Sequence, residues 1–360
     1  MINIKGKNIN ELVYNCLEKV IMTGNRTNSR NGDVSSLYNV FSEIENPRSR
    51  HLNLQGRNNN IFATIAETFW VFAGDDKIDP YLSFFLPRAK DFSDDGMSWY
   101  GGYGPRLYNH NQMDDIIQQF RNEGIFTRRA SFYIGTPELD TKESFQKTLG
   151  CDYNNIKDKP CNMTGDFFIT PDKKLHMNMK SRSGDILWGF GSINIFEYTY
   201  FQEFILQELK REIDPELTLG TYNHHVTNLH LYDFSGSQGY SVLENKLQQK
   251  LGYQNYESLK FPKGVENFNN FHKELVELFS KCIQSKKSTT FKDLMNYVSS
   301  IFDKYDLSQG NLLFKYAELT LAYIIKKKHP EAVFEVNIQD LDEEVKNSII
   351  NSKFRKFEIS

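Results

Sequence analysis

Residues 160–182 read PCNMTGDFFITPDKKLHMNMKSR, and the interpretation of the whole chain starts from this stretch. Within it, residues 164–180 alternate apolar and polar side chains on either side of a Pro-Asp-Lys-Lys turn, which predicts a β-hairpin. Such a hairpin returns Arg182 to the vicinity of Cys161. A free thiol with a pKa of about 8.5 is mostly protonated at neutral pH, so a reactive cysteine needs a cation nearby. The alternative for Cys161 is a buried structural thiol, the usual environment of a free cysteine.

The surrounding sequence predicts an α+β protein without the regular βαβ alternation of a dinucleotide-binding domain. The predicted helices cover residues 8–22, 60–73, 195–212, 266–285, 291–304 and 311–328. The predicted strands outside the hairpin cover residues 128–135 and 216–232, while residues 25–33 and 93–104 have the polar or glycine-rich character of loops. We therefore predict a catalytic domain over residues 1–240 and a mostly helical extension over residues 241–360 that ends in a short charged tail.

The composition fits an ordinary globular protein, with 360 residues of which 39% are hydrophobic and 25% charged. The formal net charge of −3 argues against a general binder of nucleic-acid polymers. The four cysteines, Cys16, Cys151, Cys161 and Cys282, are too scattered for a disulfide framework or a metal site, which suggests reduced thiols. Neither a signal peptide nor an apolar run long enough to span a membrane is apparent, so we expect a cytoplasmic protein.

Several arginines are candidates for binding an anion. Arg182 and Ser183, followed by Gly and Asp, suit the capture of a phosphate, because a guanidinium forks onto two oxygens and the hydroxyl adds a donor. Arg30 and the pair Arg128 and Arg129 are further candidates. Taken singly, each of these arginines fits a solvated surface charge, and spacing alone does not make them converge.

Glu67 is the single acid in the strongly apolar helix predicted at residues 60–73. Its carboxyl group is either partly buried beside a cavity or on the solvated side of the helix, and the pattern weighs these two alternatives equally. Acids of the first kind are costly and are over-represented at active sites.

Two other motifs carry less weight. The three glycines of YGGYGPR (100–106) suggest a phosphate loop only weakly, because no G-x-x-x-x-G-K-[ST] pattern is present. His224, His225 and His230 could suggest a metal site. A His-His-x4-His run in a strand would divide between its two faces, however, and no second cluster supplies ligands. We therefore expect no metal centre.

Taken in order, these segments resemble the thymidylate synthase superfamily. The resemblance rests on SRNG (29–32), AETFWVFAG (66–74), SDDG (93–96), GGYGPRL (101–107), RR (128–129), PCN (160–162), RSGD (182–185), GFGSIN (189–194) and NLHLY (228–232). It covers about residues 8–235 and implies the family fold, a large mixed β-sheet flanked by helices. The helices after residue 240 are then an extension that a minimal synthase lacks.

The resemblance implies an enzyme that transfers one carbon from 5,10-methylenetetrahydrofolate to C5 of a pyrimidine nucleoside monophosphate. Cys161 matches the nucleophile that adds to C6 of the base, and Asn162 follows it directly. Glu67 matches the acid that runs a water network for proton transfers. Tyr103 matches the tyrosine near the site where the C5 proton is removed.

The resemblance also implies the binding residues. Arg182, Ser183 and Arg30 match phosphate ligands, with Arg26 as a competitor of Arg30. Arg128 and Arg129 match a pair that reaches the phosphate of the neighbouring subunit, which implies a homodimer. The remaining matches are Asn194 or its neighbour Ile193 toward the base, His230 and Tyr232 toward the sugar, and Asp185, Trp188 and Gly189 toward the folate.

Departures from the synthase pattern leave the reaction open. Asn162 stands where the synthases have histidine, Ser181 where they have glutamine, and FLPRAKDF (85–92) where they carry tryptophans over the new exocyclic carbon. Hydride transfer to that carbon gives a methyl group, whereas water gives hydroxymethyl, and loss of an aromatic wall admits water. The SRNG, SDDG and YGxRL versions of the motifs also resemble nucleotide hydroxymethylases, including those that act on CMP.

The sequence weighs methylation and hydroxymethylation equally. The amide of Asn194 favours uracil without excluding cytosine. A third hypothesis is a catalytically inactive nucleotide sensor, against which the joint presence of Cys161, Glu67, Tyr103 and Arg182 argues.

Overall fold

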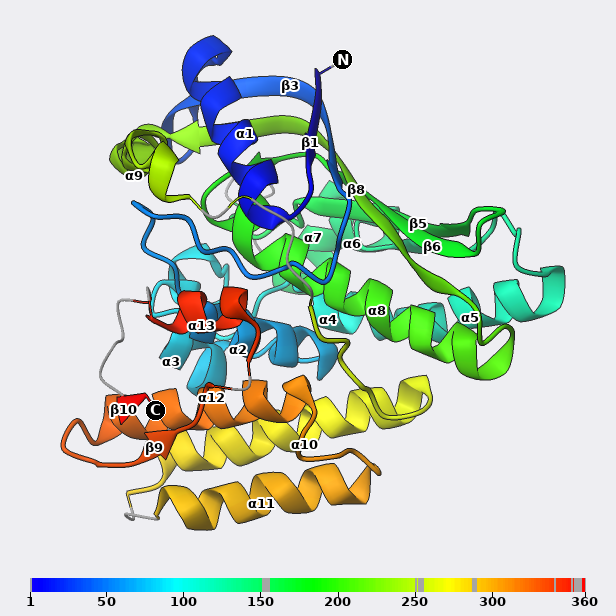
Figure 1. The fold of residues 1–360 in the computed structure, drawn as a ribbon. Helices are drawn as coiled ribbons and strands as arrows, with labels where there is room; N and C mark the ends of the chain where they lie inside the picture. The colour runs from blue at the N-terminus through cyan, green and yellow to red at the C-terminus, as the bar shows by residue number, and fades with distance from the viewer. Residues whose placement is uncertain are drawn as a thin grey trace.

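The computed structural model describes residues 2–150, 156–249, 251, 256–286, 290–339, 341–350, 352 and 358–359. Its main sheet has eight strands in the order β1-β3-β8-β6-β5-β4, with β2 beside β3 and β7 beside β8 (Figure 1). These strands are β1 (Ile2–Gly6), β2 (Asn25–Ser29), β3 (Gly32–Ile44), β4 (Ser131–Tyr133), β5 (Asn162–Ile169), β6 (Lys174–Ser181), β7 (Gly184–Asp185) and β8 (Thr218–Tyr232). The pairs β1/β3, β6/β8 and β7/β8 are parallel and the others antiparallel. This large mixed sheet confirms the predicted α+β class.

The predicted hairpin is the pair β5 and β6, whose register runs from Asn162 opposite Ser181 to Ile169 opposite Leu175. Its alternation places one set of side chains on the buried face of the sheet and the other set on a half-exposed face. Gly165 lies on the buried face because a Cβ atom there would come within 2.4 Å of the Phe132 ring.

The prediction of a loop at residues 25–33 is wrong. β2 pairs with the start of β3, so these residues form a hairpin whose turn holds Arg30 and Asn31. β2 contacts only one neighbouring strand and has no buried residue, so its side chains lack the apolar alternation by which a strand is recognised.

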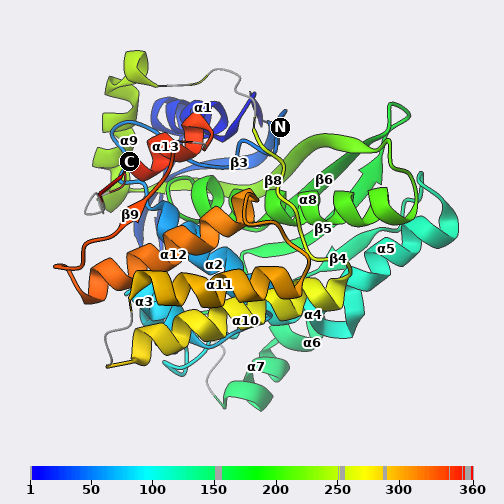
Figure 2. The same cartoon turned by 60° about the horizontal axis from the view of Figure 1, so that its bottom comes forward.

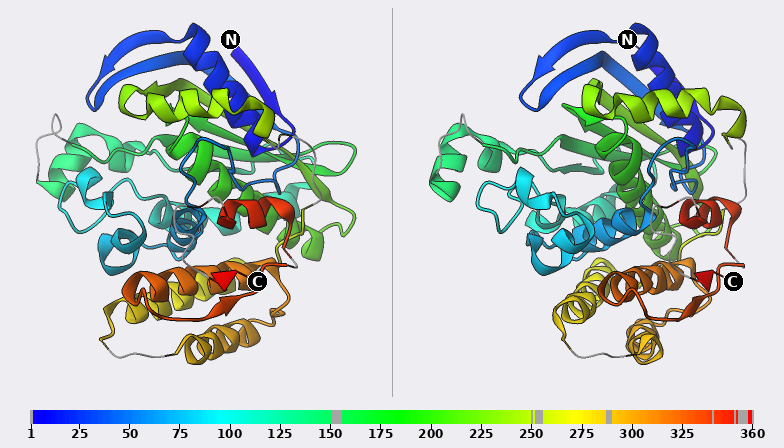
Figure 3. Two further views of the ribbon diagram at one scale, coloured as in Figure 1. Left: turned by 60° about the vertical axis from the view of Figure 1, so that its left-hand side comes forward. Right: turned by 90° about the vertical axis from the view of Figure 1, so that its left-hand side faces the viewer.

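Helices cover the sheet and then stack away from it in further layers (Figures 1 and 3). The helices as far as residue 244 are α1 (Ile9–Thr23), α2 (Ile61–Phe72), α3 (Ser83–Phe85), α4 (Tyr103–Tyr108), α5 (Gln112–Glu123), α6 (Pro137–Asp140), α7 (Lys142–Leu149), α8 (Ile195–Glu212) and α9 (Asp233–Glu244). Short 3-10 or π turns are η1 (Ile78–Leu82), η2 (Ala89–Phe92), η3 (Asn109–Asn111), η5 (Gly189–Asn194) and η6 (Lys246–Gln248).

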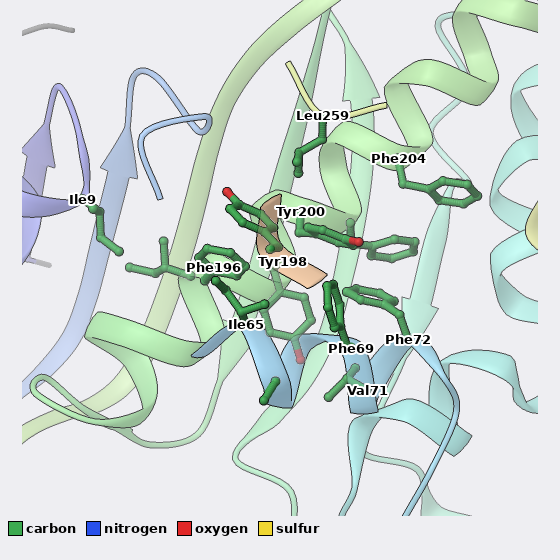
Figure 4. Close-up of a cluster of buried hydrophobic side chains, with 14 of the residues drawn as sticks. Ile9, Ile65, Phe69, Val71, Phe72, Phe196, Tyr198, Tyr200, Phe204 and Leu259 are labelled. Atoms are coloured by element: carbon green, nitrogen blue, oxygen red, sulfur yellow. The ribbon is translucent and has the colours of Figure 1, made fainter. Parts of the chain in front are cut away.

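α8 is fixed to the sheet by the Gln202 amide, which donates to the carbonyl oxygens of Leu175 (3.0 Å) and Thr221 (3.1 Å). α2 packs on the other side of α8 and is buried along its whole length. Figure 4 shows aromatic side chains of both helices, among them Phe69, Phe72 and Tyr200, gathered in the space between them. α2 is therefore an interior layer, which explains its almost wholly apolar sequence.

The later helices are α10 (Val265–Gln284), α11 (Phe291–Lys304), α12 (Leu312–Lys328) and α13 (Glu343–Ile350), and a small parallel sheet joins β9 (Glu335–Val336) to β10 (Glu358–Ile359). α10 and α12 pack on the outer side of α2, and α11 packs on α10 and α12 (Figure 2). The bounds of α10, α11 and α12 agree with the predicted helices to within one residue. The two-residue strands were not predicted, and the proposed domain boundary at residue 240 stays a prediction.

Candidate active site

Cys161 lies directly before β5, at the end of the hairpin where β6 also ends. Its carbonyl oxygen accepts a hydrogen bond from the Arg182 backbone N–H at 2.9 Å, so the hairpin does return Arg182 to the thiol as predicted. Burial raises the pKa of Cys161, while the positive charges of Arg182 and Arg30 lower it and the negative charge of Asp158 raises it. The thiol is half-buried, and the two cations are what favours its thiolate.

Two guanidinium groups hold the segment that precedes the thiol. Arg182 donates to the carbonyl oxygens of Pro160 (3.0 Å) and Lys159 (2.7 Å). Arg30, at the turn between β2 and β3, donates to the carbonyl oxygens of Lys157 (2.9 Å) and Ile156. A guanidinium has five N–H donors, so each arginine keeps further donors besides those used in these contacts. Ser183 follows Arg182 and is partly buried.

Arg26 does not lie with this group. It forms an exposed two-point ion pair with Asp233 at the start of α9. Of the two arginines that compete for one role in the sequence, the structure thus brings Arg30 to the cysteine and leaves Arg26 at the surface.

The two departures around the cysteine contact each other. Asn162 and Ser181 are directly opposite in the hairpin, and the Ser181 hydroxyl donates to the Asn162 side-chain oxygen. The same hydroxyl lies 2.6 Å from Nε2 of His224, whose Nδ1 is 3.0 Å from the Tyr222 hydroxyl. Burial lowers the pKa of His224 to about 3, so this histidine is neutral. The buried chain of polar groups orients Asn162 beside Cys161.

Tyr103 begins α4 in a space that the neighbouring glycines leave free. A Cβ atom at Gly101 would come within 2.6 Å of Asp158 Oδ1, and one at Gly104 within 2.5 Å of the Val71 carbonyl oxygen. These close approaches, and not phosphate binding, account for the glycines of the YGGYGPR motif. Burial raises the pKa of Tyr103, and the negative charges of Cys161, Glu197, Glu67 and Asp158 raise it further. The phenol therefore lies within electrostatic reach of all four groups.

Glu67 is buried with 7% of its surface exposed, which decides between the two alternatives left open by the sequence. Burial raises its pKa from an ordinary value of 4.5 to about 8. Glu197, in the first turn of α8, is 1% exposed, and its pKa is raised by burial and by the charge of Glu67. The sequence prediction did not include Glu197. Its local pattern gave no signal, because an acid in the first turn of a helix is common.

The residues expected to face the base and the folate lie around η5. Asn194, at the end of this turn, donates its amide to Glu197 at 3.5 Å, and both Ile193 and Asn194 are half-buried. Gly189 is so close to Asn194 that a Cβ atom would lie 3.3 Å from the Asn194 oxygen. The Trp188 side chain is 50% exposed.

Asp185 accepts hydrogen bonds from the backbone N–H groups of Leu187 (2.8 Å) and Trp188 (3.3 Å). Burial raises its pKa to about 6, an effect that the positive charge of Arg57 opposes. Arg57 is a cation that the sequence prediction missed, and it donates to the Leu187 carbonyl oxygen (Nε at 3.1 Å). A partly buried carboxyl group and a partly buried guanidinium therefore lie together at this edge of the site.

His230 and Tyr232 are close to each other near the end of β8, with ring centroids 4.9 Å apart. His230 lies opposite Asp185 in the register of β7 and β8, and burial lowers its pKa. The amide of Asn31, next to Arg30, lies 3.5 Å from the Tyr232 hydroxyl. These contacts connect the predicted sugar ligands to the turn that carries Arg30.

Arg128 and Arg129 lie apart from this group. Both are exposed before β4, and Arg129 pairs with Glu123 at 2.7 Å. Ala130, the next residue, is fixed beside Phe167, because its carbonyl oxygen accepts a hydrogen bond from the Phe167 N–H. Phe167 lies six residues along β5 from Cys161, which is about 20 Å at 3.3 Å per residue. The two arginines do not reach the cysteine of their own chain.

The described parts of the chain contain no group of three or more His, Cys, Asp or Glu side chains that could hold a metal ion. Of the three histidines considered, His224 and His230 are buried, while His225 lies on the other face of β8 and stacks on Phe41. Cys16, Cys161 and Cys282 form no disulfide, and Cys151 lies outside the described residues. In the same described ranges, every helix is too short or too polar to cross a bilayer.

Comparison with known proteins agrees with this arrangement. The thymidylate synthase family profile matches residues 13–280. A deoxyuridylate hydroxymethyltransferase of Delftia phage PhiW-14 is 34% identical over 359 residues, which cover 98% of this chain and 97% of that protein. Two proteins of the same name, from Pseudomonas phage M6 and Bacillus phage SP01, are 28% and 27% identical, each over 64% of this chain and over 61% and 59% of their own lengths.

Proposed function

Because the chain belongs to the thymidylate synthase family, we propose that it transfers a hydroxymethyl group to C5 of deoxyuridine monophosphate. The chain is a one-carbon transferase, and its similarity to three hydroxymethyltransferases favours hydroxymethylation over the methylation that the sequence had weighed equally. The names of those relatives also support deoxyuridylate over the other pyrimidine nucleotides.

One observation carries the proposal: the Tyr103 hydroxyl is within electrostatic reach of Cys161, Glu67 and Glu197 at once. A nucleophile, a phenol and buried acids are the groups that an addition to C6 and a proton removal at C5 require. Arg182 and Arg30, on the segment before the thiol, would hold the nucleotide phosphate and so fix the ring over the sulfur.

The chemistry of Cys161 follows from the electronic structure of the base. C5 of a pyrimidine is a poor nucleophile until a thiolate adds to C6, after which C5 carries the electron density of an enolate. Cys161 would supply that thiolate, Glu67 would manage proton transfers to the C4 oxygen through water, and Tyr103 would assist removal of the C5 proton. Asn162 and Asn194 would contact the base, while His230 and Tyr232 would contact the sugar.

The one-carbon donor would be 5,10-methylenetetrahydrofolate, which supplies the methylene carbon when it is bound. The residues at the edge of η5 fit its polar ring. Partly buried Asp185 can pair with ring N–H groups, Arg57 adds a cation, and the half-exposed Trp188 offers a flat apolar surface beside Gly189.

The segment at residues 85–92 supports water as the final acceptor of the carbon. It carries the exposed charged residues Arg88, Lys90 and Asp91 where the family pattern has tryptophan. Charged side chains retain water, whereas an aromatic wall excludes it and favours hydride transfer. In the position that the family pattern gives it, this segment would leave water beside the exocyclic carbon, which fits a hydroxymethylated product.

The test combines two readouts on purified enzyme with 5-tritiated dUMP, dCMP, UMP or CMP, with and without methylenetetrahydrofolate. We expect folate-dependent tritium release from dUMP with no dihydrofolate absorbance, and a hydroxymethylated nucleotide by mass spectrometry. Dihydrofolate would mean methylation, because only hydride transfer oxidises the folate. No release from any nucleotide would favour the inactive sensor.

The Cys161→Ser variant tests the nucleophile. It should abolish tritium release and keep nucleotide binding, and normal turnover of that variant would refute Cys161 as nucleophile.

We also infer a homodimer in which Arg128 and Arg129 of one subunit reach the phosphate in the other. Their exposure, their distance from the cysteine of their own chain, and the half-exposed ring of Phe41 on the outer face of the sheet support this. An Arg128→Ala/Arg129→Ala variant and the Cys161→Ser variant should each be inactive alone. Mixed and allowed to exchange subunits, they should regain activity, because one site of each heterodimer is intact. A monomer by light scattering, or no recovery on mixing, would contradict the shared site.

A further inference from the structure

Two buried carboxyl groups lie where α2 meets the first turn of α8. Glu67 Oε2 and Glu197 Oε1 are both inaccessible to solvent, and neither accepts a hydrogen bond from any residue that the structure describes. The pKa of Glu67 is raised by burial, and the pKa of Glu197 by burial and by the charge of Glu67. A buried acid ordinarily has a cation or several donors, so a pair without them is a costly arrangement.

The position of Glu197 ties this pair to the reacting base. Its other carboxyl oxygen, Oε2, accepts from the Asn194 amide at 3.5 Å, and Asn194 is the residue proposed to read the base. Its charge also acts on the Tyr103 hydroxyl, as do the charges of Glu67 and Cys161. Glu197 therefore lies on the side of the site where the base edge, the phenol and the nucleophile meet.

Two neighbouring carboxyl groups that are both buried away from water do not both ionise. Burial raises both pKa values and the charge of Glu67 raises that of Glu197 further, so the pair keeps at least one proton, and a member that has lost its proton can act as a base beside one that has not. Such a pair can hold a water molecule, accept its proton and retain the charge within a buried site. Glu67 supplies only one of the two carboxyl groups. The second, on Glu197, therefore calls for a separate explanation.

We propose that Glu197 is a catalytic carboxyl group that binds the water molecule attacking the exocyclic carbon and, with Glu67, accepts its proton. This rests on the hydroxymethyl transfer proposed above and names the base that such a transfer requires. The proposal concerns the last half of the reaction, after the one-carbon unit has joined C5.

The step balances without an oxidant or a reductant. Before it, the Cys161 sulfur is bonded to C6 and the exocyclic carbon is doubly bonded to C5. The water oxygen bonds to the exocyclic carbon, its proton passes to the carboxyl pair, and the electron pair of the double bond moves through C5 to the C4 oxygen. The C4 carbonyl then re-forms, C5 and C6 regain their double bond, and the C6–S bond breaks to release the thiolate.

The experiment separates the early step from the late one in the full-length enzyme. Glu197→Gln keeps the size of the side chain and removes its ability to accept a proton. With 5-tritiated dUMP and methylenetetrahydrofolate, we expect a burst of tritium release of about one equivalent per Cys161 at a rate close to the unmodified enzyme. Formation of the hydroxymethylated nucleotide should fall by about 10²–10⁴-fold, the usual contribution of a general base.

An added thiol sharpens the test, because 2-mercaptoethanol adds to the stalled exocyclic carbon. We expect the corresponding thioether from Glu197→Gln and little of it from the unmodified enzyme. Glu197→Asp, which retains a shorter base, should make the hydroxymethylated product at an intermediate rate. The matched control is Glu208→Gln, a buried acid of the same helix paired with Arg211, which should keep the product ratio of the unmodified enzyme.

Two results would overturn the role of Glu197. Unchanged product formation by Glu197→Gln would show that water needs no carboxyl group there. An equal loss of tritium release and of product, in both the Gln and the Asp variants, would place Glu197 in the early steps or in folding. If the unmodified enzyme itself releases no tritium or forms dihydrofolate, the hydroxymethyl transfer fails, and that outcome is distinct from either of these.

Discussion

The start and the middle of helix α8 differ in how their buried acids are partnered. At its start, Glu197 faces Glu67, and one oxygen of each lacks a hydrogen-bond donor among the residues described. In its middle, Glu203 accepts from Arg48 (3.1 Å), Arg50, the Ser258 hydroxyl (2.8 Å) and the Leu259 N–H (3.1 Å).

The difference between the start and the middle separates the acid that stabilises the fold from the acids that serve the reaction. Glu203 joins α8 to residues 48–50 and to the segment that leads into the later helices, so its charge holds parts of the fold together. The pair at the start forms no ion pair with any residue that the structure describes, and it costs desolvation energy. Natural folds keep such a destabilising pair of buried acids where a reaction uses the ionisable groups.

The largest effect should come from Glu67→Gln. A glutamine cannot exchange protons with the base through water, so tritium release from 5-tritiated dUMP should fall by about 10²–10⁴-fold. The free energy of unfolding should stay equal or rise, because a buried unpaired acid has been replaced by a neutral group. Parallel measurements of tritium release and urea unfolding check both expectations. Loss of stability with retained activity would reverse the roles assigned to the start and the middle of the helix.

Glu203→Gln should show the opposite pattern. Removing the carboxylate leaves the buried Arg50 guanidinium without its partner, which should cost about 3–5 kcal/mol of unfolding free energy. The kcat of the folded fraction should remain near that of the unmodified enzyme, because Glu203 is not among the groups that act on Tyr103. Urea unfolding gives the first quantity and active-site titration with turnover the second. A kcat loss as large as that of Glu67→Gln would contradict the comparison.

The sequence could predict one of these acids and not the other. Glu67 stands out because it interrupts the apolar run that α2 needs as an interior layer. Glu197 occupies the first turn of a helix, where an acid is common because it interacts favourably with the helix dipole, so its local pattern looks ordinary. Its pairing with Glu67 depends on the packing of α2 against α8, which sequence periodicity does not encode.

The same contrast holds for the fold. The hairpin at Cys161 follows from alternation and a turn signal, and the helices after residue 264 follow from their apolar spacing. The β2 hairpin, which places Arg30, has a polar edge strand and gave no such signal. Local patterns therefore predicted the elements with one strongly buried face. The order of the strands and the convergence of the arginines come from tertiary contacts.

A pH dependence would sharpen the comparison further. Burial raises the Glu67 pKa from 4.5 to about 8, so the folded state holds this proton more tightly than the unfolded chain between these values. Raising the pH through that window therefore removes stability from the unmodified protein. Tyr103, Cys161 and Glu197 face the same site. Glu67→Gln should gain stability relative to the parent from about pH 4.5 to about pH 8 and level off above. Urea unfolding across the window measures the difference, and a constant difference would contradict it.

The smallest effect should come from Glu212→Gln, at the far end of α8. Glu212 is paired like Glu203, with Arg121, but the two side chains are 24% and 45% exposed. Water screens such a pair and rehydrates whichever charge is left, so the loss should be about 0–1 kcal/mol of unfolding free energy, with kcat unchanged. Arg121→Gln is the matched control and should cost as little. A loss close to that of Glu203→Gln would mean that pairing alone sets the contribution of an acid on this helix. The expected small loss would mean that burial decides how much a partner stabilises an acid. It would therefore also decide how much is lost at the buried Glu67 and Glu197, which have no ion-pair partner among the residues described.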